Sequence, residues 1–147
     1  MSQQAFDKAT WLDFVNGIHA DKAFGVLGGR VTDVDDERIE LELEITDAAR
    51  QPFGLLHGGV SLLLAETAAS THATWNVDLN EIQPVGIEIS GSHLRSATEG
   101  RVRAVGRVLR RSRRFIVHDV DIVRDADGEL LTKARVTNYY RKVRQDE

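Results

Sequence analysis

The stretch Gln51-Pro-Phe-Gly-Leu-Leu-His-Gly-Gly-Val-Ser-Leu-Leu-Leu-Ala-Glu66 decides the fold, because it turns from a loop into a long apolar helix. We expect this helix to run from about Gly58 to about Trp75. It opens on Gly58 and Gly59, and neither can cover the first free amides as a Ser, Thr, Asp or Asn side chain would. Bare N–H groups at a helix start carry partial positive charge and favour an oxygen ligand, which glycine allows to approach closely.

Glu66 stands in the middle of a helix whose other residues, from Val60 to Ala69, are apolar or small nearly all round. Such a helix is expected to be buried. The side chains three and four positions from Glu66 are Leu62, Leu63, Ala69 and Ser70. A carboxylate in these surroundings is partly desolvated and therefore a candidate reactive group. From these residues alone, a satisfied buried glutamate, or one at the edge of the apolar face, remains an equal alternative.

The distance between the two features predicts a dimer. Gly58 and Glu66 are eight residues apart, which corresponds to ~12 Å of helix rise. One chain therefore cannot easily bring both groups to a single reacting carbonyl. Two antiparallel copies of the helix about a two-fold axis would place each glycine pair near the partner's glutamate.

Composition narrows the class of protein. A chain of 147 residues with 41% hydrophobic residues is expected to form one globular domain, here residues 1–147. The net charge of -4 argues against a nucleic-acid partner, and the absence of cysteine excludes disulfides and thiolate chemistry. Residues 1–8 are polar and no long apolar run occurs, so we expect no signal peptide, no membrane span and a cytoplasmic protein. No His, Asp and Glu cluster has metal-ligand spacing, so no metal is expected.

The rest of the chain predicts an α+β fold in which an antiparallel sheet wraps one long central helix. Within the N-terminal helical segment 1–20, a short helix over residues 10–18 should begin at a capping box formed by Thr10 and Asp13. A loose tail is expected at residues 142–147. The expected strands cover residues 23–32, 38–45, 85–95, 101–109, 115–123 and 130–139.

Two segments together resemble a known family. The first is Gln51–Gly59 followed by Glu66, and the second is Gln83-Pro-Val-Gly-Ile-Glu-Ile-Ser-Gly-Ser-His-Leu-Arg-Ser-Ala97. They resemble the hotdog-fold acyl-CoA thioesterases, in the branch whose catalytic carboxylate is a glutamate on the central helix. That branch includes 4-hydroxybenzoyl-CoA thioesterases, 1,4-dihydroxy-2-naphthoyl-CoA hydrolases and the enterobactin-pathway proofreading thioesterase, within the superfamily of the phenylacetate-pathway thioesterases. The resemblance covers about residues 20 to 141.

The resemblance implies hydrolysis of an acyl-CoA thioester, with an aromatic acyl group favoured, at a site shared between two chains. It implies a homodimer at least, with dimers paired into a homotetramer, and no cofactor apart from the CoA of the substrate. Glu66 would be the nucleophile or general base, and the Gly58 amide, with Gly59 beside it, would polarise the thioester carbonyl. Gln51 and His57 would orient the carbonyl or the attacking water. Ser70 would lie near the leaving sulfur or the water.

Further substrate contacts are implied at two places. His93 and Arg95 would contact the acyl or pantetheine end, and within Arg110-Arg-Ser-Arg-Arg114 the candidates for the CoA phosphates are Arg111, Ser112 and Arg113. Each has a structural alternative: a loop-bracing His57, a half-buried strand histidine at position 93 and a solvated hairpin end at the arginines. The alternative function is a non-catalytic acyl-CoA-binding hotdog module, which the presence of Glu66 disfavours.

Overall fold

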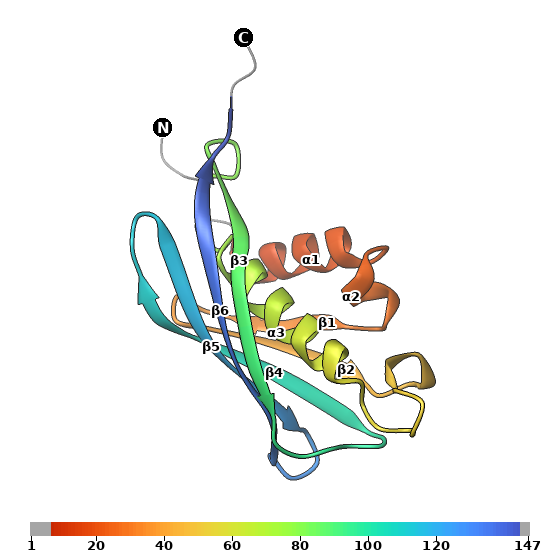
Figure 1. The fold of residues 1–147 in the computed structure, drawn as a ribbon. Helices are drawn as coiled ribbons and strands as arrows, with labels where there is room; N and C mark the ends of the chain where they lie inside the picture. The colour runs from red at the N-terminus through yellow and green to blue at the C-terminus, as the bar shows by residue number, and fades with distance from the viewer. Residues whose placement is uncertain (1–6, 145–147) are drawn as a thin grey trace.

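The computed structural model describes residues 7–144 and confirms the hotdog arrangement, in which one long helix lies in the curve of an antiparallel sheet (Figure 1). The elements follow the chain as α1 (Lys8–His19), α2 (Ala23–Val26), β1 (Arg30–Val34), β2 (Arg38–Glu44), the 3-10 helix η1 (Asp47–Ala49), α3 (Gly58–His72), β3 (Ile82–His93), β4 (Arg101–Arg111), β5 (Phe115–Arg124) and β6 (Leu130–Lys142).

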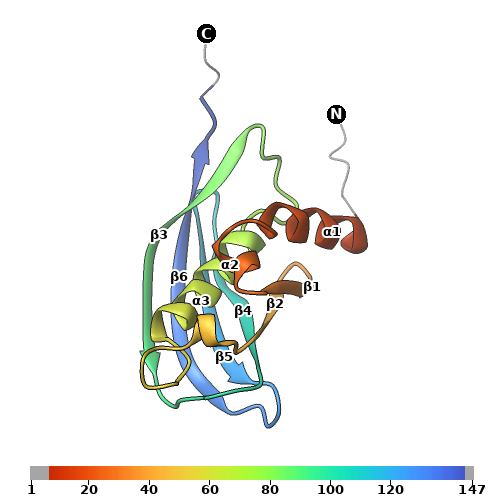
Figure 2. The ribbon, with the colours of Figure 1, turned by 90° about the vertical axis from the view of Figure 1, so that its right-hand side faces the viewer.

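The sheet has six strands in the order β1-β2-β4-β5-β6-β3, and every neighbouring pair is antiparallel. The sheet curls around α3, while α1 and α2 lie beside α3 over the β1 end (Figures 1 and 2). Strand β3 forms one edge of the sheet and passes along α3. This topology brings the helix that carries Glu66 against β3 and β6, which are distant from it in sequence.

Small side chains allow α3 to lie close to the sheet. Ala65, Ala68 and Ala69 are fully buried on the helix. Opposite them, a Cβ at Gly106 of β4 would come within 3.1 Å of Ile39 Cγ2 and 3.7 Å of the Ala68 Cβ. Close packing of this kind excludes water from the core and fixes the position of the helix.

Strand β2 shows the predicted alternation of buried and solvent-facing residues. Its apolar residues, Ile39 and Leu41 among them, are buried against the core. The outward glutamates are paired rather than merely solvated, since Arg103 lies 3.3 Å from Glu40 and Arg101 lies 3.4 Å from Glu42. Surface pairs of this kind contribute about 0 to 1 kcal/mol each, so burial of the apolar face contributes more to the stability of the strand.

The strand expected over residues 23–32 is wrong as far as residue 29, because the chain first forms α2 and a turn, and β1 begins only at Arg30. Tertiary contacts explain the difference. Phe24 is buried, and a Cβ at Gly29 would clash with the Phe24 ring, while one at Gly25 would clash with the His19 carbonyl oxygen. The glycines therefore mark close packing around a buried aromatic ring.

The ends of several elements also differ from the expectation. Helix α1 begins at Lys8 and is capped by Asp7, whose carboxylate accepts the Thr10 amide at 3.1 Å, so no Thr10 capping box forms. Helix α3 ends at His72, and β3 begins two residues before Pro84, which this sheet-edge strand tolerates. Strand β6 includes Lys142, where the loose tail was predicted to begin, and residues 145–147 of that prediction lie outside the described residues.

None of the helices in residues 7–144 has both the length and the apolar character needed to cross a membrane.

Candidate active site

The start of α3 is only partly bare. His57 is the N-cap residue, and its Nδ1 accepts the Gly59 amide at 2.8 Å, so the expectation of two uncovered amides is wrong for Gly59. The Gly58 amide has no acceptor within residues 7–144. One free N–H therefore remains at the positive end of the helix, and His57 fixes the turn that presents it.

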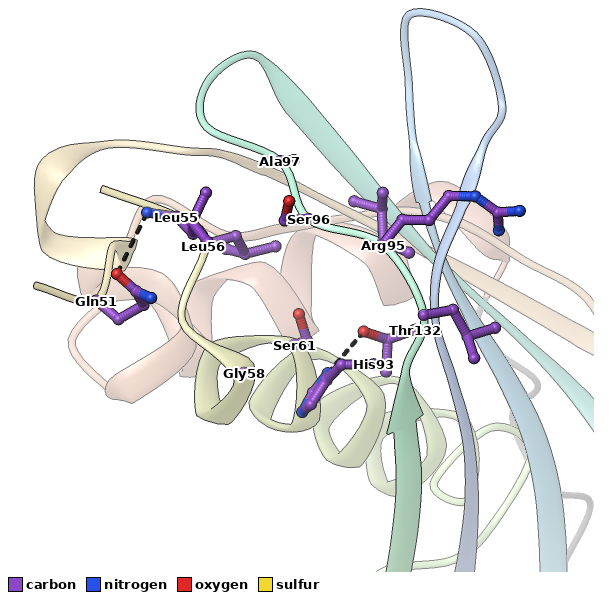
Figure 3. Close-up of a pocket in the computed structure, with 12 residues that line it drawn as sticks. Gln51, Leu55, Leu56, Gly58, Ser61, His93, Arg95, Ser96, Ala97 and Thr132 are labelled. Carbon is purple, nitrogen blue, oxygen red and sulfur yellow. Dashed lines mark hydrogen bonds between the residues drawn. The ribbon is translucent and has the colours of Figure 1, made fainter. Parts of the chain in front are cut away.

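Gly58 is required by a close contact with His93. A Cβ at Gly58 would lie 2.7 Å from His93 Nε2, so the ring rests against the helix start in a space that a larger residue would fill. The other ring nitrogen of His93, Nδ1, lies 2.9 Å from Thr132 Oγ1 (Figure 3). This hydrogen bond fixes the ring beside the free Gly58 amide.

Gln51 braces the loop before α3 through its side-chain oxygen. Its Oε1 accepts the amides of Phe53 and Leu55, the second at 3.4 Å (Figure 3). With the oxygen committed to the loop, the Nε2 group has no acceptor among residues 7–144 and is a hydrogen-bond donor at the pocket edge.

These groups surround a pocket of about 370 Å³, a size typical of small-molecule sites. Its walls are mixed apolar and polar and come from the loop before α3, the first turn of α3, the end of β3 with the loop that follows it, and the start of β6. The lining residues are Gln51, Leu55, Leu56, Gly58, Ser61, His93, Leu94, Arg95, Ser96, Ala97, Leu131 and Thr132. Arg95 lines the edge, but its guanidinium points away from the pocket (Figure 3) and pairs with Glu129 at 2.5 Å.

Glu66 is half-buried and lies outside this pocket. Its Oε1 accepts the hydroxyl of Ser70, one turn further along, at 3.1 Å. The structure thus gives Ser70 a contact with the carboxylate, whereas the sequence placed it near the leaving sulfur or the water. Gly86 of β3 makes room for the same oxygen, because a methyl group at that position would clash with it. A β-bulge between Gly86 and Glu88 interrupts the β3–β6 ladder at this point, and bulges are frequent beside active sites.

The residues predicted for the CoA phosphates are not brought to the pocket within one chain. They lie at the β4–β5 hairpin, near the opposite end of α3 from Gly58 (Figure 1). Arg111 donates to the Asp36 carbonyl at 2.6 Å, and Ser112 Oγ accepts the Phe115 amide at 3.0 Å within the turn. Arg113 is exposed.

Two buried histidines that had no expected role lie together in the structure. His72 at the end of α3 and His118 of β5 are fully buried, and His72 Nδ1 lies 2.7 Å from His118 Nε2. His72 Nε2 donates to the Asp35 carbonyl at 2.7 Å, so a neutral His72 accepts the His118 proton. Burial lowers the pKa of both rings, and the pKa of His118 falls to about 3 because the His72 ring and Arg111 add to the effect of burial.

A sequence signal for this pair existed. His118 stands two residues from Ile116 and from Val120, on the buried face of its strand, so its burial follows from the alternation. Asn138 was also missed; it is fully buried, two residues after Val136 on the inner face of β6. Its partner, Ser70, could not be named without knowing which residue of α3 lies opposite it.

Within residues 7–144, no group of three or more His, Asp or Glu side chains is arranged to hold a metal ion.

The sequence around this site matches a known protein family. Residues 53–131, more than half of the chain, match the Thioesterase superfamily. The chain belongs to this superfamily. The matched segment contains both halves of the site, Gly58 at the pocket and Glu66 against Gly86, and it extends into β6. The predicted class, a hotdog-fold thioester hydrolase, is thereby confirmed.

Several known proteins resemble most of the chain. The 1,4-dihydroxy-2-naphthoyl-CoA hydrolase of Escherichia coli (strain K12) is 36% identical over 126 residues, covering 86% of this chain and 91% of the relative. A mutant thioesterase from Pseudomonas aeruginosa has a similar structure, with a TM-score of 0.87 and 33% identity over 96% of this chain and 98% of that one. A Staphylococcus aureus protein, solved as a glutamate-to-alanine mutant, has a TM-score of 0.78 and 31% identity over 80% of this chain and 97% of that one.

The Staphylococcus aureus protein has also been solved as a glutamine-to-alanine mutant, described as a thioesterase enzyme, with a TM-score of 0.76 and 31% identity over 79% of this chain and 95% of that one. Its substituted glutamine and glutamate stand fifteen residues apart. Gln51 and Glu66 have the same spacing in this chain.

Proposed function

We propose that this thioesterase hydrolyses an acyl-CoA thioester with an aromatic acyl group, giving the free acid and CoA. The observation that carries the proposal is the pair of half-sites on α3: a free Gly58 amide at a pocket, and a Glu66 carboxylate held by Ser70 in a space left by Gly86. A relative that covers most of the chain is named as a hydrolase of a bicyclic aromatic CoA thioester, which supports the aromatic class.

The chemistry assigns a role to each group. Attack on the carbonyl carbon places negative charge on its oxygen, and the Gly58 amide stabilises that charge, by about 3 kcal/mol for one well-placed donor. Glu66 either removes a proton from the attacking water or attacks the carbon itself, forming an anhydride that water then hydrolyses. In both routes the C–S bond breaks, the acyl carbon gains OH from water, and the CoA sulfur leaves as the thiolate and takes up the remaining proton. Gln51 Nε2 orients the carbonyl.

Two copies of the chain complete each site in this proposal. The pocket that contains Gly58 lacks Glu66, and the two groups are separated by ~12 Å along one helix. Part of α3 is not covered by its own sheet, since Gly59 is exposed and Leu63, Glu66 and Ser70 are half-buried along one stripe of the helix. Strand β3 beside it is a sheet edge, an element that commonly pairs with a second chain. An antiparallel dimer would cover this stripe and bring Glu66 to the partner's pocket.

The spacing in the Staphylococcus aureus relative supports the choice of residues. Its two alanine substitutions fall on a glutamine and a glutamate separated as Gln51 and Glu66 are here. His57 acts by capping the helix and presenting the Gly58 amide.

Turnover of 1,4-dihydroxy-2-naphthoyl-CoA, followed by release of the CoA thiol, tests the proposal. The variant Glu66→Gln keeps the shape of the side chain and removes the base, and we expect kcat to fall by about 10³-fold or more with little change in KM. An aliphatic acyl-CoA of similar length serves as the comparison substrate and should be turned over more slowly. Equal kcat in the wild type and in Glu66→Gln would refute the role of Glu66.

A hybrid experiment tests whether sites are shared. Gln51→Ala and Glu66→Gln are each expected to be poorly active, but in a mixed dimer one of the two sites carries both intact residues. Random mixing should therefore restore roughly a quarter of wild-type sites. A mixture no more active than the two separate variants would show that each site lies within one chain.

For the CoA nucleotide we assign Arg113, because Arg111 and Ser112 are engaged in contacts within the chain. Arg113→Ala should raise KM for the CoA ester a few-fold, in the range of one phosphate contact. The N-acetylcysteamine ester of the same acid lacks the nucleotide, and its KM should not change. An equal effect on both esters would exclude this assignment.

A further inference from the structure

The side-chain amide of Asn138 is buried close to Ser70, which in turn contacts Glu66. With the amide oxygen and nitrogen as placed, the donors and acceptors of this group do not match. Ser70 Oγ is 3.1 Å from Glu66 Oε1 and also 3.1 Å from Asn138 Oδ1. A hydroxyl has a single proton, and neither an ionised carboxylate oxygen nor an amide oxygen can donate. One proton therefore cannot serve both oxygens.

The other atom of the same amide has the opposite problem. Asn138 is fully buried, and its Nδ2 has no acceptor within residues 7–144. A buried amide donor without a partner is destabilising, because it has given up its hydrogen bonds to water. Rotating the amide by half a turn about its Cβ–Cγ bond exchanges two atoms of nearly equal size, so that a donor faces Ser70 Oγ. An oxygen then takes the unpartnered buried position, which a carbonyl tolerates more often than an N–H donor does. Asn138 Nδ2 then donates to Ser70 Oγ, and the Ser70 hydroxyl donates to Glu66.

The sheet positions these groups together. Asn138 of β6 is the cross-strand partner of Gly86 of β3, the glycine that makes room for Glu66 Oε1. Cross-strand partners project to the same face of a sheet, here the face that packs against α3. The bulge that follows Gly86 leaves Ile87 as an extra residue, exposed at 55%, and breaks the regular ladder at this point. A gap at Gly86 and a donor at Asn138 thus flank one carboxylate.

We propose that Asn138 is a positioning residue, whose amide donates to Ser70 and so directs the Ser70 hydroxyl to the ionised carboxylate of Glu66. The inference rests on the proposed function, because it needs Glu66 as the reacting group. Asn138 does not touch the substrate. Without its donor the Ser70 hydroxyl is free to turn away, and the carboxylate loses both its fixed orientation and a bond that favours its charged form.

The test compares steady-state kinetics and pH–rate profiles of Asn138→Leu with those of the wild type. Leucine has a similar size and removes the amide, so kcat should fall about tenfold, the effect of one lost hydrogen bond, with KM nearly unchanged. The acidic limb of kcat/KM should move to higher pH, because the charged form of the base is less stabilised. Thr137→Val, the neighbouring residue on the opposite face of the strand, is the matched control and should leave both quantities unchanged.

A double-mutant cycle separates positioning from packing. Once Ser70→Ala has removed the hydroxyl, adding Asn138→Leu should cost nothing more in kcat, whereas a general packing defect would cost the same in both backgrounds. Asn138→Asp, which can only accept, should lower kcat further than Asn138→Leu; the leucine variant decides the matter if the aspartate variant does not fold.

Wild-type kcat in Asn138→Leu, an acidic limb that moves to lower pH, or additive losses with Ser70→Ala would each overturn the inference. A shift of the acidic limb to lower pH is expected if the Asn138 oxygen, not its nitrogen, faces Ser70 and competes with Glu66 for the proton of the Ser70 hydroxyl. These failures are distinct from failure of the proposed function, which would appear as undiminished turnover by Glu66→Gln.

Discussion

The last turns of α3 carry two polar clusters that differ in their surroundings. In the first, Glu66 and Ser70 are half-buried and lie on the uncovered stripe of the helix. In the second, His72 and His118 are fully buried and bonded to each other. Both clusters consist of titratable or hydroxyl groups joined by hydrogen bonds, so residue type alone does not distinguish them.

The difference shows which cluster can do chemistry. The histidine pair is kept neutral by burial and ends on the Asp35 carbonyl, so no substrate group can reach it. The Glu66–Ser70 cluster contacts the fully buried Asn138 on its inner side. On its outer side, the half-buried Glu66 carboxylate can be approached by a ligand or a second chain. Substitutions in the Glu66–Ser70 cluster should therefore affect catalysis, while substitutions in the buried pair of His72 and His118, here called the sealed pair, should affect stability.

Gly86→Ala should give the largest effect in this comparison. The added methyl group would clash with Glu66 Oε1 and displace the carboxylate. A displacement of about 1 Å in a reacting group can lower kcat by about 100-fold. The free energy of unfolding should change little, because the φ angle of Gly86 is not in the left-handed region.

Gly17→Ala is the matched control for that substitution. Apart from its chain neighbours and the backbone of its own helix, no described atom lies within 4 Å of the position that its Cβ would take, and its φ is also ordinary. Within helix α1, alanine should stabilise the protein by roughly 0.5 to 1 kcal/mol and leave kcat unchanged. Steady-state kinetics and urea unfolding of both variants give the measurement; full activity in Gly86→Ala would mean that Glu66 is not held where the structure places it.

The sealed pair predicts a pH dependence of stability. An unfolded histidine takes up a proton below about pH 6.5, whereas the folded His118 remains neutral until about pH 3. The unfolded state therefore binds more protons in this window, and the free energy of unfolding should fall as the pH falls from about 6.5 toward 3. The slope for one such group is at most about 1.4 kcal/mol per pH unit.

Carboxylates also titrate in that window, so the variant His118→Gln isolates the contribution of the histidine. Glutamine can still donate to His72 Nδ1 but does not titrate. Urea unfolding at pH 7 and at pH 4.5 should show a smaller difference for His118→Gln than for the wild type, with kcat at pH 8 unchanged. An equal pH dependence in both proteins would show that His118 is not kept neutral by the fold.

The same contrast explains what the sequence could predict. The loop-to-helix segment at Gly58, the alternation in β2 and the family motif were sufficient for the fold and for naming Glu66 as the candidate carboxylate, because each is a local pattern. Helix α2 was not predictable, since its glycines are fixed by contacts with the buried Phe24 ring. Asn138 required the register of β3 and β6 and the position of α3, which no local pattern contains.

The cap at His57 gives the smallest expected effect and decides whether this ring acts by structure or by chemistry. Histidine is not a usual N-cap residue, yet its Nδ1 accepts the Gly59 amide. His57→Ala should lower the free energy of unfolding by about 1 kcal/mol, as Asp7→Ala should at the start of α1. Only the first should lower kcat, because only His57 presents the Gly58 amide to the pocket.

His57→Asn makes the distinction sharp, since asparagine is a good cap but a poor base. If capping is the whole role of His57, the asparagine variant regains both the lost stability and the lost kcat. A variant that regains stability but stays slow would show that the imidazole ring itself takes part in the reaction. The first outcome would make His57 a structural residue that caps the helix, and would leave Glu66 as the nucleophile or general base of the site.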